Sequence, residues 1–154
     1  MLVGLLLVGP ARAQSGGTHA ADKQAAQSAA QEWLALLEDR DFEDSWEEAA
    51  APCRAQQTGL DAWTQTATRL ADSVGAPAAR TLTSAQYQDS LRAAAAEGPF
   101  VILKYRTRFA AGRYEELVLV VRGEDDWRVA GYRVSPLRTP DPPMPTLPER
   151  GPGR

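Results

Sequence analysis

The sequence predicts an α+β domain in which three helices pack on one face of a four-stranded antiparallel meander sheet. Residues 99–134 read as three strands joined by short turns, because β-branched and large apolar side chains recur there with the period of two that strands require. The chain before them repeats its apolar residues every three or four positions, as amphipathic helices do. Helices followed by a run of hairpin-connected strands form a two-layer α+β domain.

The strands and their turns follow from composition. The four predicted strands cover residues 80–87, 99–109, 114–122 and 127–134. The turns at 110–113 and 123–126 are too short for a parallel crossover, so the last three strands should pair antiparallel. A four-residue first turn would pair Phe109 with Tyr114.

Three helices are predicted from the spacing of apolar residues. They cover residues 21–37, the segment between Asp41 and Pro52, and residues 60–74. Asp41 is expected to cap the second helix and Pro52 to end it. Thr58 and Asp61 resemble a capping box for the third helix, which Gly75 should end. Four tryptophans are expected to meet in one core: Trp33, Trp46, Trp63 and Trp127.

The 154 residues suit one domain, over 20–135, between two other segments. Residues 1–13 resemble a secretory signal peptide, with an apolar run and an Ala-Arg-Ala cleavage sequence, so we expect a periplasmic or secreted protein. The basic start of such a peptide is missing, as in an N-terminally truncated one. A membrane anchor is the alternative, but the run is much shorter than the about 20 residues that span a bilayer. Residues 15–20 read as a polar leader, and the Pro-rich residues 136–154 as a disordered or extended tail.

Composition and charge disfavour several classes of protein. The formal net charge of −3 lacks the basic footprint of a nucleic-acid binder, so no nucleic-acid partner is expected. Lys104, Arg106 and Arg108 alternate along one strand, but Glu115 and Glu116 are expected to pair with them across the turn.

The search for catalytic or metal-binding residues is mostly negative. His19 is the only histidine and lies before the domain, so no Ser-His-Asp triad is expected within it. With one His and one Cys, the chain offers no zinc set, and no cofactor, metal ligand or catalytic residue is predicted. Cys53 is expected to be a small, half-buried filler, with an intermolecular disulfide as the alternative.

A small set of polar side chains could nevertheless bind a ligand. Tyr105, Thr107 and Arg69 could project into a cone-shaped cavity with Glu116 at its mouth. A tyrosine can donate a proton and a half-buried carboxylate can accept one, which is the basis of an enzyme alternative. The structural alternative packs the ring of Tyr105 in the core and bonds its hydroxyl to a helix backbone group.

The sheet face away from the helices should carry an apolar centre with basic residues around it. The predicted interface residues are Arg106, Leu117, Leu119, Val121 and Tyr132. Apolar patches of this kind seldom stay bare in a soluble monomer, so this face is expected to bind another protein, most simply a second copy in a homodimer. The alternative is that the Pro-rich tail or arginine stems cover it.

The chain also resembles a known bacterial family. The resemblance is carried by Trp33-Leu34, Ser45-Trp46, Trp63, Arg69, Gly75, Arg80, the Tyr105-x-Thr107-x-Phe109 strand, Glu115-Glu116 and the segment Trp127–Tyr132. These residues resemble domain-of-unknown-function family 4019, small exported proteins, over about residues 25–134. Arg40 stands where that family tends to have glycine. The layout also resembles the cystatin-like, nuclear-transport-factor-2-like cone, in which a curved sheet wraps a helix.

The resemblance implies no established activity, since cone folds host enzymes and binding modules alike. We therefore expect an exported, non-catalytic domain that binds a protein or a small ligand in the bacterial envelope. The alternatives are a cone-fold enzyme using Tyr105 with a carboxylate and a structural homodimer.

Overall fold

The computed structural model describes residues 15–90 and 98–137, with side chains from residue 19 onward. It confirms the α+β class. The elements are α1 (Ser15–Glu38), α2 (Phe42–Glu48), α3 (Ala51–Arg54), α4 (Leu60–Val74), β1 (Pro77–Gln88), β2 (Phe100–Phe109), β3 (Gly112–Arg122) and β4 (Trp127–Pro136). The predicted signal peptide, most of the predicted tail and part of the 88–98 connection lie outside the described residues. The cone likeness stays a prediction.

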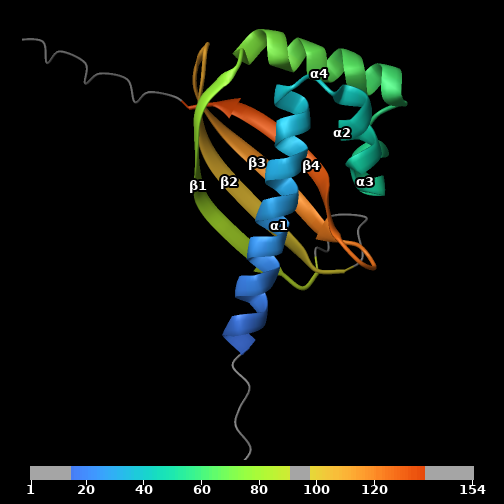
Figure 1. Ribbon diagram of the computed structural model, residues 1–154, viewed down its shortest axis with the longest axis vertical. Coiled ribbons are helices and arrows are strands. Elements are labelled where there is room, and N and C mark those ends of the chain that lie inside the picture. The colour runs from blue at the N-terminus through green and yellow to red at the C-terminus, as the bar shows by residue number, and fades with distance from the viewer. Residues whose placement is uncertain (1–14, 91–97, 138–154) are drawn as a thin grey trace, which may run out of the picture.

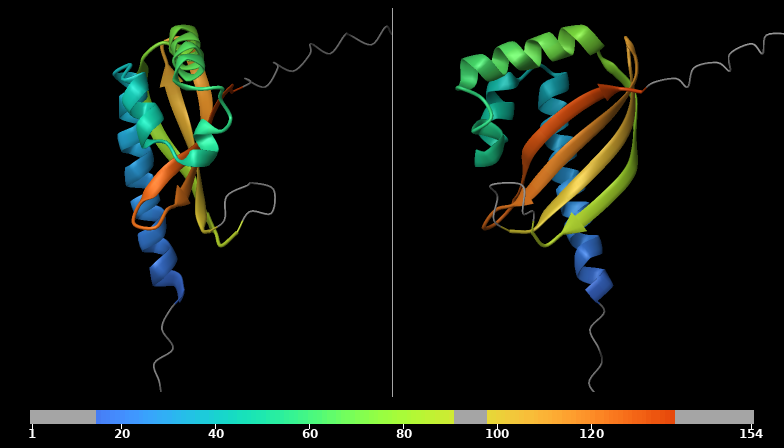
Figure 2. Two further views of the ribbon diagram at one scale, coloured as in Figure 1. Left: turned by 90° about the vertical axis from the view of Figure 1, so that its right-hand side faces the viewer. Right: turned by 180° about the vertical axis from the view of Figure 1, so that it is seen from behind.

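The four strands form one antiparallel sheet in the order β1-β2-β3-β4. Helix α1 runs along one face of the sheet, α4 crosses above one end of it, and α2 and α3 lie beyond β4 (Figure 1). We call the face that contacts α1 the inner face. The opposite, outer face carries no described helix, as the view from behind shows (Figure 2).

The core forms where α1 meets the inner face. Ala26 and Ala30 are fully buried, and such small side chains allow the helix to approach the sheet closely. The next turn of α1 buries Trp33 and Leu34. The strands contribute a set of apolar side chains at alternate positions: Val101, Leu103, Val118, Val120 and Val129. The alternation along β2 and β3 therefore predicts the inner face correctly.

Two tryptophans anchor α2 to this core. The rings of Trp33 and Trp63 lie 5.9 Å apart between centroids. Trp33 Nε1 donates to the carbonyl of Ser45 at 2.7 Å, and Trp63 Nε1 donates to the Ser45 hydroxyl at 3.0 Å. Trp46 and Trp127 are partly buried against the same cluster, so the predicted meeting of four tryptophans is confirmed.

The register of the hairpins corrects two predictions. Phe109 pairs with Gly112 rather than with Tyr114, because the first turn has two residues and not four. This shift of two residues keeps every β3 side chain on its predicted face. The β3–β4 hairpin contains a bulge between Val129 and Gly131, opposite Leu119 and Val120. Each β4 side chain after the bulge therefore lies on the opposite face from the one predicted.

The helix boundaries correct four more. Helix α1 begins at Ser15, so the predicted polar leader is helical, and His19 on it lies against the ring of Tyr87. Pro52 does not end α2 but lies in the first turn of α3. A proline fits there, because backbone N–H groups in the first turn of a helix have no partner within the helix. Asp41 is the N-cap residue of α2 but makes no side-chain capping bond, and α4 begins after Gly59 without the predicted capping box.

Candidate functional site

A buried carboxylate lies at the centre of the site. Glu116 projects from β3 to the inner face and is 0% exposed. Arg80 donates to it from Nε at 2.7 Å and from the Nη2 nitrogen at 3.1 Å. The Tyr132 hydroxyl donates to the same carboxylate at 2.6 Å, and the Thr107 hydroxyl donates to it as well. The four donors satisfy both oxygens of a charge that would otherwise be costly to bury.

Arg80 connects this carboxylate to α1. Its remaining guanidinium nitrogen, Nη1, donates to Glu38 in the last turn of that helix. One arginine on β1 therefore bridges a carboxylate on β3 and a carboxylate on α1. These contacts join α1 to all four strands. We call the group the Arg80 cluster; its members are Glu38, Arg80, Thr107, Glu116 and Tyr132.

The cluster changes the acidity of its members. Burial raises the pKa of Tyr132, and the charge of Glu116 and the hydrogen bond to it raise that pKa further. For Arg80, burial alone would lower the pKa, but the hydrogen bonds and charges of Glu116 and Glu38 outweigh it and leave the pKa raised. Tyr132 therefore stays neutral and Arg80 stays charged at physiological pH.

A cavity of about 230 Å³ adjoins the cluster between α1, α4 and one end of the sheet. Its wall is mostly apolar, with Arg80, Glu38 and Tyr132 as polar members. The apolar part comes from Leu34, Leu37, Phe42, Trp63, Ala67, Leu70, Ala71, Val74 and Phe109. Arg40, Gln56 and Thr66 also line the cavity and are exposed, so it opens to solvent. Cys53 in the wall is buried rather than half-buried, and that burial raises the pKa of its thiol despite the opposing charge of Arg54.

The structure brings together only part of the predicted ligand site. Thr107 and Glu116 lie in the Arg80 cluster, but Glu116 is buried and not at a cavity mouth. Tyr105 is 2% exposed, and its hydroxyl has no hydrogen-bond partner among the described residues, so the predicted bond to a helix backbone is wrong. Arg69 is exposed on α4 and does not line the cavity.

The predicted interface residues divide between the two faces. Arg106, Leu117, Leu119 and Val121 lie on the outer face. Tyr132 does not, because the bulge in β4 places it opposite Val118 on the inner face, where its ring packs 5.5 Å from that of Trp33. The predicted pairing of Glu116 with the basic residues of β2 is also wrong, because Glu116 points to the inner face.

Sequence reasoning missed Arg80 and Glu38 as site residues. Arg80 pairs with Thr107 across β1 and β2, so it shares the inner face with that residue. A basic residue on an otherwise apolar face is the available signal, but the loose alternation of β1 hides it. Glu38 ends α1 next to Leu37, where a carboxylate on an exposed helix end reads as a solvated charge.

Two further features of the described residues concern metal and membrane. No three of their His, Cys, Asp and Glu side chains are grouped so that they could hold a metal ion. None of their helices combines the length and the apolar character needed to cross a membrane.

Comparison with known proteins identifies the family. A family model described as protein of unknown function DUF4019 matches residues 29–132. The chain belongs to the DUF4019 family. All five members of the Arg80 cluster and all the residues that line the cavity lie within the matched residues. No curated protein matches the chain.

Proposed function

We propose that this DUF4019 protein is an exported, non-catalytic domain that binds a small, largely apolar ligand in the cavity beside the Arg80 cluster. The observation that carries the proposal is the apolar cavity itself, which is open to solvent and has polar groups at one end. Binding sites for small molecules typically combine an apolar wall with a few placed polar groups.

The size of the cavity limits the ligand. At about 230 Å³ it exceeds the roughly 150 Å³ of an engineered cavity that holds benzene, and it falls short of the roughly 300–1,000 Å³ of pockets for drug-sized ligands. A substituted aromatic ring or a short alkyl chain with one polar end fits this range.

The charges around the cavity favour a neutral or cationic head group. Glu38 and Glu116 place two carboxylates around the one guanidinium of Arg80. The other basic residue of the wall, Arg40, is already paired with Asp72 at 2.7 Å. A ligand carboxylate or phosphate would meet no cation without an acidic partner in this wall, so an anionic head is disfavoured.

The same geometry favours binding over catalysis. A general base needs a free lone pair directed at its substrate, whereas the Glu116 carboxylate accepts bonds from three side chains. The raised pKa of Tyr132 removes it as a nucleophile. Tyr105, the residue of the enzyme alternative, makes no hydrogen bond to that carboxylate.

Export is supported by the sequence alone. The apolar run Leu2–Val8 followed by Ala11-Arg12-Ala13 fits cleavage after Ala13. Intact-mass measurement of the protein from the envelope fraction tests this. Recovery from the cytoplasm with residues 1–13 retained would contradict it.

Ligand binding can be tested with a matched chemical series. Octylammonium, octanol and octanoate share one chain and differ in head-group charge. Trp63 lines the cavity and reports binding through its fluorescence. We expect saturable binding of octylammonium and octanol, and weaker binding of octanoate. Tight octanoate binding would contradict the charge argument, and failure of all three to bind would contradict the proposal.

A cavity-filling variant locates the site. Ala71 lines the cavity, so Ala71→Phe should abolish binding by occupying it. Ala62 lies on the same helix outside the wall, and Ala62→Phe is the matched control that should bind normally. Equal effects of both variants would show that the ligand binds elsewhere.

A further inference from the structure

The outer face of the sheet carries an unusual combination of side chains. Register places Ile102, Leu117 and Leu119 at its centre, and all three are partly exposed. Lys104, Arg106 and Arg133 surround this centre on the neighbouring positions of β2 and β4. Across the four strands the outward positions hold six basic residues and one acidic residue, Glu115, although the whole chain is acidic.

Of these six basic residues only Arg128 is paired within the described part of the chain, with Asp126 at 2.9 Å. Arg108 pairs directly with Arg113 across the β2–β3 hairpin, a like-charge arrangement that is unfavourable without an external partner. Glu115 stands opposite Arg106, yet none of the five basic residues Lys104, Arg106, Arg108, Arg113 and Arg133 makes an ion pair with a described residue.

The segments outside the described residues carry no excess of acidic charge. Residues 1–14 and 138–154 together contain four arginines and two acidic residues, and residues 91–97 contain one of each charge. A second copy docked through the same face would bring basic side chains against basic side chains. Charge therefore disfavours both the tail and a symmetric dimer as occupants.

We propose that the outer face binds an acidic, amphipathic segment of another protein, with apolar side chains on the Ile102–Leu117–Leu119 centre and carboxylates at the surrounding basic residues. Protein interfaces commonly combine an apolar centre with a polar rim whose charges complement those of the partner. Among the outward positions of the described strands the only aromatic residue is Phe100, which is buried. The face thus offers neither the Trp and Tyr anchors of membrane surfaces nor the stacking rings of single-strand nucleic-acid binders.

Binding to defined probes tests the proposal. Two helical peptides of equal length and equal negative charge are compared, one with leucines along one side and one with serines in their place. Fluorescence anisotropy with the full chain should show saturable binding of the leucine peptide, weakened but not abolished by salt. Preference for anionic phosphatidylglycerol vesicles or single-stranded DNA over the leucine peptide would overturn it, as would equal binding of both peptides.

Substitutions on the outer face locate the binding surface. Arg106→Glu and Leu119→Ser should each weaken binding of the leucine peptide at least about tenfold. Arg69→Glu, the same charge change on an exposed site of α4, should leave it unchanged. Equal loss with Arg69→Glu would overturn the assignment of the face. Arg106 is exposed, so its variant should fold normally, which a thermal melt verifies.

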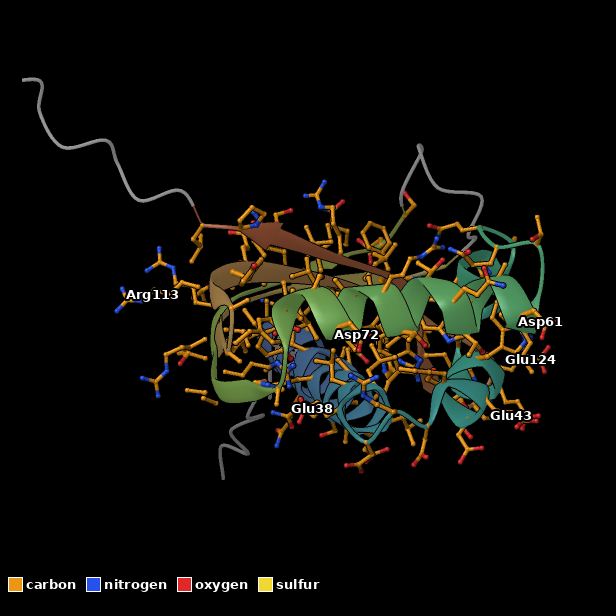
Figure 3. All side chains as sticks on the ribbon, turned by 90° about the horizontal axis from the view of Figure 1, so that it is seen from above. Glu38, Glu43, Asp61, Asp72, Arg113 and Glu124 are labelled. Carbon is orange, nitrogen blue, oxygen red and sulfur yellow. The ribbon has the colours of Figure 1, made fainter. Side chains whose placement is uncertain are left out.

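Self-association is the remaining outcome to separate. Arg113 projects from one end of the molecule, while Glu43, Asp61 and Glu124 lie at the other (Figure 3). Copies joined head to tail would bring these opposite charges together in an open chain. Light scattering that shows concentration-dependent growth, abolished by Arg106→Glu, would assign the face to a second copy and overturn the proposal of a different partner.

Discussion

Arg80 on β1 and Glu116 on β3 form a two-bond ion pair across the intervening strand β2. The carboxylate is fully buried and the arginine side chain is 18% exposed. An intact buried ion pair of this kind adds only modestly to the free energy of unfolding, because the cost of desolvation offsets the attraction between the charges. Its loss is costly, since the partner that remains is buried without a counter-charge. The pair therefore resists any change that separates β1 from β3.

The first prediction concerns the loss of the arginine. Arg80→Ala should lower the free energy of unfolding by about 3–5 kcal/mol, because it leaves the Glu116 charge buried and unpaired. Denaturant unfolding measures this. Asp72→Ala is the control, since it breaks the exposed Arg40–Asp72 pair and should cost at most about 1 kcal/mol.

A double variant identifies the cause of that loss. Glu116→Gln removes the charge; its amide oxygen can accept from one of the Tyr132 and Thr107 hydroxyls, and its amide nitrogen can donate to the other. Arg80→Ala combined with Glu116→Gln should therefore be more stable than Arg80→Ala alone. If the double variant is less stable, lost packing of the arginine stem and not the orphaned charge explains the cost.

The second prediction concerns alkaline pH. The pKa of Tyr132 is raised in the folded state, and burial together with the nearby Glu116 charge also raises the pKa of Tyr105, although Arg80 opposes it. Below the unfolded tyrosine pKa of about 10, both states keep these protons, so these two tyrosines do not change the stability there. At higher pH the unfolded chain loses them first, so the free energy of unfolding should fall.

Removing the hydroxyl tests this assignment. Tyr132→Phe deletes one of the groups that titrate at alkaline pH, so the stability of the variant should decrease less steeply with pH above about 10 than that of the wild type. Denaturant midpoints across this pH range provide the comparison. The same slope in both proteins would contradict a role for Tyr132 in the alkaline loss.

The alternation of apolar residues predicted the sheet well, and a local irregularity limited it. Val101, Leu103 and Val118 point inward as their period of two predicts. Tyr132 was assigned to the wrong face because the bulge in β4 inserts one unpaired residue, and a shift of one residue moves every later side chain across the sheet. A glycine inside a strand often marks a bulge, so Gly131 was the available signal, although it does not say which residue is left unpaired.

The site was harder to predict because it depends on pairing between strands. Glu115 and Glu116 are adjacent, and strand geometry sends one inward and the other outward. Only the register with β2 determines that Glu116 faces Thr107 and Tyr105 on the inner side. Arg80 and Glu38 are distant in sequence from this residue, and their meeting follows from the packing of α1 on the sheet.

The third prediction concerns the end of α1. Arg40 has φ of +63°, and the N–H of Asp41 donates to the carbonyl of Leu36, as in a Schellman motif. The left-handed conformation costs a non-glycine residue about 1–2 kcal/mol, and a glycine avoids this cost. Part of that gain is offset, because glycine has more conformational entropy in the unfolded chain. Arg40→Gly should therefore stabilise the protein by about 0.5–1 kcal/mol.

A second substitution at the same position separates conformation from charge. Arg40→Ala also breaks the exposed pair with Asp72 but keeps a Cβ in the left-handed region. It should give no gain in thermal stability, and a gain equal to that of Arg40→Gly would show that backbone strain is not the cause.

The last prediction concerns the contact between the end of α4 and the β2–β3 turn. Gly75 has φ of +73°, and a Cβ built there would lie 2.7 Å from the Cβ of Ala110. The turn is fixed in place, because the Ala110 N–H donates to Ala76 and the Ala111 N–H donates to Val74. Gly75→Ala should therefore cost about 1–2 kcal/mol for the conformation and a further 1–3 kcal/mol for the clash.

A compensating variant divides these two costs. Ala110→Gly removes the atom that clashes, so in the Gly75→Ala background it should restore the steric part and leave the conformational part. Gly59→Ala serves as the comparison, since Gly59 also has positive φ but its Cβ would meet nothing within 4 Å. Denaturant unfolding of the wild type, Gly75→Ala, Ala110→Gly and the double variant gives the coupling free energy between positions 75 and 110. Additive effects of the two substitutions would show that α4 moves away from the hairpin, and that the contact between them does not position the cavity wall.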